Sequence, residues 1–161
     1  MSAEQPHVRL EILSNPLLNC GAREMVASMS RRMGFAEDAA CQIALAVDEA
    51  LCNIERHGYD RQTDRPIWLS LHAIGGLAQN GTSSSPTEGL KIVIEDEAQQ
   101  IDPNLIKSRP LDEIRPGGLG VHIIREVMDE VIYEQRPNSG MRLTMIKMRN
   151  PQRKKDSGGP S

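Results

Sequence analysis

The stretch from residue 43 to residue 58 carries the most information in this chain, and it reads Ile43-Ala-Leu-Ala-Val-Asp-Glu-Ala-Leu-Cys-Asn-Ile-Glu-Arg-His-Gly58. Its apolar side chains recur at helical spacing, as a buried helix face requires: Ile43, Val47, Leu51 and Ile54. A polar stripe repeats every four residues: Glu49, Asn53 and His57. A carboxylate near a carboxamide suits a hard metal ion with a proton acceptor beside it. The solvated face of an amphipathic helix explains the same spacing, so the helix alone leaves both interpretations open.

A second stretch, from Arg115 to Met128, reads Arg-Pro-Gly-Gly-Leu-Gly-Val-His-Ile-Ile-Arg-Glu-Val-Met and predicts a glycine-rich loop that enters a helix. Gly117, Gly118 and Gly120 would let the backbone approach a ligand closely. The free N–H groups at the start of the following helix attract phosphate. The pattern is neither a P-loop nor the dinucleotide fingerprint, and a plain loop before a helix is the alternative.

Between these stretches, residues 90 to 96 form a β-branched run that predicts a strand ending in Glu95 and Asp96. Two carboxylates at the end of a core strand need partners. An Asp in this place can accept a hydrogen bond from an exocyclic amine such as that of adenine. A strand end that reaches solvent is the simpler alternative.

The order of these motifs resembles the histidine-kinase-like ATPase fold, and more closely the small single-domain serine/threonine kinases that act as bacterial anti-sigma factors. The resemblance rests on residues 45–59 and 117–131 and extends over residues 8–148. It implies an α+β fold, a two-layer sandwich whose mixed, mostly antiparallel sheet is covered on one face by helices. It also implies ATP and Mg²⁺ as cofactors.

The resemblance assigns a role to each motif residue. Glu49 would be the general base, Asn53 would ligate Mg²⁺, and Asp96 would bind the adenine amine. Backbone N–H groups in the glycine-rich loop would bind phosphate, and Arg115 would reach the γ-phosphate. The implied nucleotide-binding residues are Asn53, Asp96, Ala98, Arg115, Gly117, Gly118 and Gly120.

The middle motif departs from the family pattern Asp-x-Gly-x-Gly, because Ala98 and Gln100 stand in the glycine places. The added side chains are expected to crowd the nucleobase, so that glycine at both positions would raise affinity. The Asp102-Pro103 that follows the family motif is present.

The implied function is phosphorylation of a small antagonist protein, together with sequestration of a sigma factor. A homodimer is compatible with it. Two alternatives stay open: a nucleotide-binding module that sequesters a partner without phosphotransfer, and a scaffold that binds no nucleotide. Transfer is more sensitive than binding to the misplacement that an altered motif can cause.

The composition agrees with one domain in a reducing compartment. The chain has 161 residues, 25% charged residues and a net charge of −3, so no basic field indicates nucleic acid. Cys20, Cys41 and Cys52 are odd in number and indicate no disulfide framework. No signal peptide or membrane-length apolar run is visible, and we expect a cytoplasmic protein that binds no membrane.

We expect a single ATP-binding domain over residues 1–149 and a disordered tail over 150–161. The predicted strands are 7–13, 66–74, 90–96, 131–134 and 141–148. The predicted helices are 15–33, 37–57 and 119–128. Residues 75–89 are expected to form a flexible insertion and residues 104–116 a lid.

Overall fold

The computed structural model describes residues 5–77, 87–106 and 119–150. Its strands are β1 (Val8–Leu13), β2 (Pro66–Ile74), β3 (Gly89–Asp96), β4 (Glu130–Gln135) and β5 (Met141–Met148). Its helices are α1 (Asn19–Arg32), α2 (Glu37–Asn53) and α3 (Leu119–Val127), with a π-helical turn at Ile54–Gly58 and 3₁₀ turns at Pro16–Leu18 and Pro103–Leu105. Every helix and strand predicted from the sequence is present.

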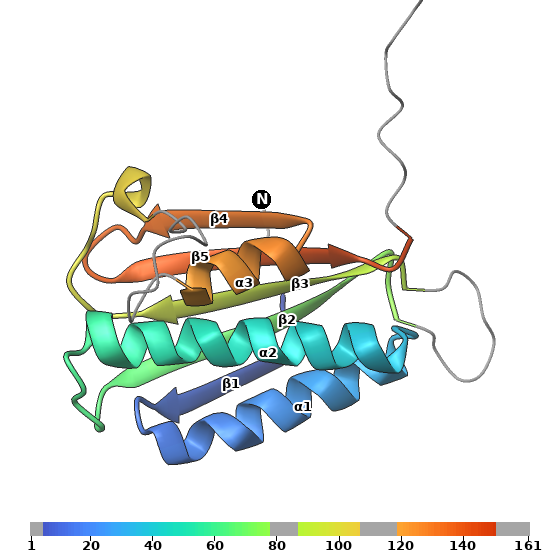
Figure 1. The fold of residues 1–161 in the computed structure, drawn as a ribbon, viewed down its shortest axis with the longest axis horizontal. Helices are drawn as coiled ribbons and strands as arrows, with labels where there is room; N and C mark the ends of the chain where they lie inside the picture. Colours follow the sequence, from blue (N-terminus) through green and yellow to red (C-terminus); the bar gives the residue numbers. More distant parts are fainter. Residues whose placement is uncertain (1–4, 78–86, 107–118, 151–161) are drawn as a thin grey trace, which may run out of the picture.

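The five strands form one sheet in the order β1-β2-β3-β5-β4, and all four strand pairings are antiparallel. The three helices lie on one face of this sheet, with α2 between α1 and α3 (Figure 1). The predicted two-layer α+β sandwich is confirmed. The sheet is wholly antiparallel, whereas the resemblance implied a mixed one.

The core lies between the sheet and the helices, and the strand sequences explain why. In β3 the side chains of Leu90, Ile92 and Ile94 are buried while the residues between them are half-exposed, which is the alternation of a sheet covered on one face. The helices bury the face that periodicity predicts, through Ile43, Val47 and Leu51 of α2. The largest fully buried side chains also include Val26, Ile67, Leu69, Leu71, Ile124 and Met145.

Two helix boundaries differ from the prediction. The first helix begins as a 3₁₀ turn, because the Asn15 side chain accepts from the Leu17 N–H and Pro16 follows it; the helix ends before Gly34, which has φ +93°. The α-helical part of the motif helix ends at Asn53 rather than at His57. The wider π turn that follows is closed by a hydrogen bond from the Tyr59 N–H to the Ile54 carbonyl at 2.8 Å.

Three predictions fall partly on residues outside the described ranges. These are most of the insertion at 75–89, the lid beyond residue 106 and the tail beyond residue 150. Among the described residues, no helix combines the length and the apolar character that crossing a membrane demands.

Candidate nucleotide-binding site

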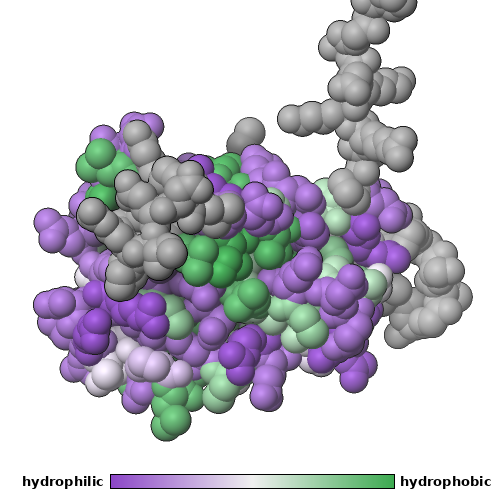
Figure 2. Space-filling model, in the orientation of Figure 1, coloured by the Kyte–Doolittle hydropathy of each residue, from purple (hydrophilic) through white to green (hydrophobic). Residues whose placement is uncertain are grey.

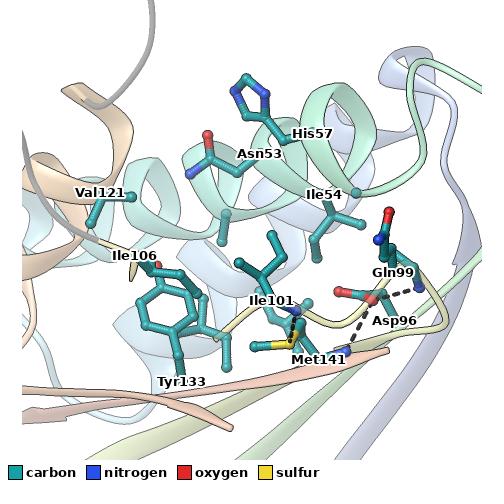
Figure 3. Close-up of a pocket in the computed structure, with 15 residues that line it drawn as sticks. Asn53, Ile54, His57, Asp96, Gln99, Ile101, Ile106, Val121, Tyr133 and Met141 are labelled. Carbon is teal, nitrogen blue, oxygen red and sulfur yellow. Dashed lines mark hydrogen bonds between the residues drawn. The ribbon is translucent and has the colours of Figure 1, made fainter. Parts of the chain in front are cut away.

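A cavity of about 220 Å³ opens between the end of α2, the π turn, α3 and the ends of β3 and β5. Figure 3 shows that the helical segment contributes Asn53 and His57, while Asp96 lies across the cavity at the sheet. Apolar side chains line the cavity between these polar residues. The lining residues are Ala50, Asn53, Ile54, His57, Gly58, Ile94, Asp96, Ala98, Gln99, Ile101, Ile106, Val121, Tyr133, Met141 and Leu143.

Asp96 is the buried polar residue on the sheet side, with 5% of its surface exposed. Its Oδ1 accepts hydrogen bonds from the backbone N–H of Ala98 at 2.8 Å and of Met141 at 3.1 Å. Burial raises the pKa of this carboxyl, while those two hydrogen bonds and the charge of Arg136 act in the opposite direction. The result is a carboxylate of fixed orientation on the wall of an apolar cavity.

Glu95 does not enter the cavity. It lies on the other face of β3, where its Oε1 accepts from Arg142 Nη2 at 2.8 Å and lies 3.5 Å from Arg136 Nε. The two carboxylates at this strand end, which the sequence analysis expected to need partners, therefore differ in role: Glu95 is paired with cations, and Asp96 faces the cavity.

The polar stripe of α2 meets the start of α3. A Cβ built at Gly120 would lie 2.6 Å from Glu49 Oε2 and 3.3 Å from Asn53 Nδ2. Only a residue without a side chain fits there without displacing both groups. The fold thus brings the last glycine of the glycine-rich stretch to the carboxylate and carboxamide of the motif helix, about 70 residues earlier in the chain.

His57 lies on the rim of the same cavity and is exposed. It reaches this position from the π turn, one residue before Gly58. Gly58 is itself crowded, because a Cβ at this position would lie 2.9 Å from the Ala98 Cβ. The methyl group that replaces a glycine of the family pattern at Ala98 therefore packs against a glycine of the motif helix.

Gln100, the second departure from the family pattern, does not line the cavity. Its Nε2 donates to the carbonyl oxygens of Arg136 and Gly140, in the turn between β4 and β5. The expectation that its bulk crowds the nucleobase finds no contact to support it.

Sequence reasoning missed the apolar wall formed by Ile101, Tyr133 and Met141. Met141 belongs to β5, which pairs with β3, and Tyr133 belongs to β4, which pairs with β5; neither pairing can be read from local sequence. On the helix-covered face of the molecule, apolar side chains also gather over α3 (Figure 2). Leu119, the first residue of α3, is 58% exposed.

Three predicted site residues lie outside the described ranges: Arg115, Gly117 and Gly118. Within those ranges, no group of three or more His, Cys, Asp or Glu side chains could hold a metal ion by itself. A Mg²⁺ ion bound mainly by phosphate oxygens and water needs only one or two protein ligands. The Asn53 carboxamide, beside the Glu49 carboxylate, offers one oxygen ligand of that kind, and the buried Asp96 acceptor suits a nucleobase amine, so the residues present fit a magnesium–nucleotide complex.

Comparison with known proteins gives independent evidence on the family of this chain. A family model described as histidine kinase-like ATPase domain matches residues 18–147. The chain is 28% identical over 133 residues to the serine-protein kinase RsbW of Halalkalibacterium halodurans, which covers 78% of this chain and 72% of that protein. It is 26% identical to the protein of that name from Bacillus thuringiensis (86% of this chain, 82% of the relative) and 24% identical to that from Bacillus velezensis (95% and 92%).

These matches confirm the resemblance that the motifs indicate. The family match spans α1 to β5 and contains the whole cavity described above. By its motifs, its fold and this match, the chain belongs to the histidine kinase-like ATPase family.

Proposed function

We propose that this chain is an ATP-dependent protein serine/threonine kinase of the anti-sigma-factor type. One observation carries the proposal: Glu49, Asn53 and Gly120 meet beside an apolar cavity whose sheet side presents the buried carboxylate of Asp96. A purine suits the apolar part of this cavity, and phosphates suit the polar part. Relatives over most of the chain's length carry the name serine-protein kinase.

Each side of the cavity then binds a different part of ATP. The Asp96 carboxylate accepts a hydrogen bond from the adenine amine, beside the methyl group of Ala98. On the other side, the Asn53 oxygen ligates Mg²⁺, which when bound neutralises phosphate charge. From the family pattern, backbone N–H groups at Gly117, Gly118 and Gly120 bind the phosphates, and Arg115 contacts the γ-phosphate.

Glu49 is the proposed general base. Its carboxylate takes the proton of the attacking serine or threonine hydroxyl. The hydroxyl oxygen forms a bond to the γ-phosphorus while the bond to the β–γ bridging oxygen breaks, and ADP leaves. Glu49 lies one helical turn before Asn53, so the base would stand beside phosphates held at Asn53, where this proton would be lost.

The partners proposed here follow from the family. The phosphate acceptor would be a serine on a small antagonist protein, and the chain would bind a sigma factor until the antagonist competes for it. A homodimer, a cytoplasmic location and a single domain over residues 1–149 with a tail over 150–161 belong to the same proposal.

The decisive experiment compares Glu49→Gln with a matched control, Glu126→Gln, which makes the same chemical change on the exposed surface of α3. Calorimetry measures ATP binding with and without Mg²⁺, and labelled ATP measures transfer to a serine-bearing partner protein purified from the same cell. Glu49→Gln should bind ATP like the parent chain but transfer phosphate about 10²–10⁴-fold more slowly. Glu126→Gln should change neither quantity.

Three results would redirect the proposal. Parent-like transfer by Glu49→Gln would remove Glu49 as the base. Tight magnesium-dependent ATP binding without any transfer by the parent chain would favour a nucleotide-binding module that sequesters its partner. Absence of ATP binding would favour a scaffold that uses the fold without the nucleotide.

A further inference from the structure

The turn between β4 and β5 is tied to the altered middle motif by a set of hydrogen bonds that we call the hairpin tie. It joins residues 96–101 to residues 135–141. Gln100 forms one part of it, because its half-buried side chain donates from Nε2 to the carbonyl of Arg136 and, at 3.3 Å, to the carbonyl of Gly140. A glycine at position 100 could make neither bond.

Arg136 forms the second part of the hairpin tie. Its Nη1 donates to the main-chain carbonyl of Asp96, its Nε lies 3.5 Å from Glu95 Oε1, and its guanidinium carbon lies 5.2 Å from the centre of the Trp68 ring. The side chain is therefore held by a carbonyl, a carboxylate and an aromatic face at once. A planar, multidentate cation of this kind fixes the end of β3 relative to the turn.

Further bonds continue the tie to residue 101. The Gln135 Nε2 donates to the Ile101 carbonyl at 3.2 Å, and the Ile101 N–H lies 3.5 Å from the Met141 sulfur. Gly140 has φ +80°, and a Cβ there would overlap the Asp96 carbonyl, so the turn and the strand end touch directly.

The carboxylate of Asp96 takes its two backbone donors from opposite sides of this tie. Ala98 belongs to the altered motif, and Met141 begins β5. A shift of the motif against the turn would move one donor relative to the other and would rotate the carboxylate. The orientation of the only side chain assigned to the nucleobase amine thus depends on contacts made by Gln100 and Arg136.

We propose that Gln100 and Arg136 are positioning residues for nucleobase recognition: through the hairpin tie they hold the Asp96 carboxylate toward the 6-amino group of the purine. In this chain the side-chain contacts of the hairpin tie take the place of the two glycines in the family's middle motif. The inference rests on the proposed nucleotide site. It reverses the expectation from sequence, because replacing Gln100 weakens ATP binding instead of relieving a clash.

The test measures two nucleotides in the presence of Mg²⁺: ATP, and purine riboside triphosphate, which has no group at the position of the amine. The variants are Gln100→Ala and Arg136→Lys. Their matched controls are Gln42→Ala, on the exposed face of α2, and Arg142→Lys, which also removes a guanidinium from Glu95 but makes no described hydrogen bond to residues 96–101.

Both test variants should bind ATP roughly 3- to 10-fold more weakly, the scale of one hydrogen bond, while purine riboside triphosphate binding stays near the parent value. The controls should keep the parent preference for ATP. Thermal melting without nucleotide reports any loss of fold, and if Arg136→Lys does not fold, Gln100→Ala decides alone.

Equal weakening of both nucleotides would assign the tie a structural role only and overturn the proposal. Unchanged or tighter ATP binding by Gln100→Ala would also overturn it. Neither result would affect the proposed function, which fails separately if the parent chain binds no ATP.

Discussion

Replacing Asp96 with asparagine tests the role of a single atom, the Oδ2 of the carboxylate. The backbone N–H groups of Ala98 and Met141 both donate to Oδ1, so an asparagine must keep its oxygen at that position. Its NH₂ group then occupies the place of Oδ2. The substitution preserves the contacts that hold the loop but presents a donor to the donor amine of adenine.

Two hydrogen-bond donors that face each other in a buried site cost about 1–3 kcal/mol of binding free energy. That corresponds to roughly 5- to 150-fold weaker ATP binding. Purine riboside triphosphate lacks the amine, so its affinity should change little. The preference for ATP over this analogue should therefore fall by the same factor in Asp96→Asn.

The substitution Asp96→Asn should not lower the stability of the nucleotide-free protein. Burial raises the pKa of the Asp96 carboxyl above its ordinary value of 3.8, so the charged form is disfavoured in the folded state. The folded protein then binds more protons than the unfolded chain, and the free energy of unfolding decreases as pH rises from 3.8 through the folded pKa. Asp96→Asn removes this pH-dependent loss of stability, so the variant should melt at a temperature at least as high as the parent at pH 7.

Calorimetry with both nucleotides, paired with thermal melting at pH 7, tests these expectations. Glu97→Gln is the matched control, because Glu97 is the exposed neighbour of Asp96. If Asp96→Asn melts at least as high as the parent and binds ATP at the parent affinity, the assignment of Asp96 to the nucleobase is refuted.

Two further predictions concern the fold. Glu55 is 4% exposed, and among the described residues only its Oε2 receives a hydrogen bond, from Asn19 Nδ2 at 3.2 Å. Burial raises the pKa of this carboxyl above 4.5. Glu55→Gln should therefore remove a loss of stability that the parent suffers as pH rises through the folded pKa. Melting curves between pH 4 and 8 check this, and parallel pH profiles for parent and variant would contradict it. Gly140→Ala should lower the free energy of unfolding by more than about 2 kcal/mol, because strain at positive φ adds to overlap with the Asp96 carbonyl. Gly76→Ala, at φ +97° and with no atom of the described residues within 4 Å of the added Cβ, measures the strain alone in urea unfolding, and equal losses in the two variants would show that the overlap is relieved without cost.

Local patterns in the sequence were enough to predict the helices and the strands and to locate the motifs. The apolar period of residues 43–54 predicts the buried face of α2, and Gly34 predicts the end of α1, because periodicity and helix termination depend on neighbours along the chain. The order of three motifs predicted the family, since each motif is short and continuous.

The tertiary structure determined what lies between those motifs. Met141 donates to Asp96 only because β3 pairs with β5, and Gly120 meets Glu49 only because α3 packs on α2. The sequence predicted that Gln100 would crowd a ligand, but the folded chain directs it to the β4–β5 turn. The direction of a side chain between two possible partners depends on strand register and packing over distances that no local pattern records.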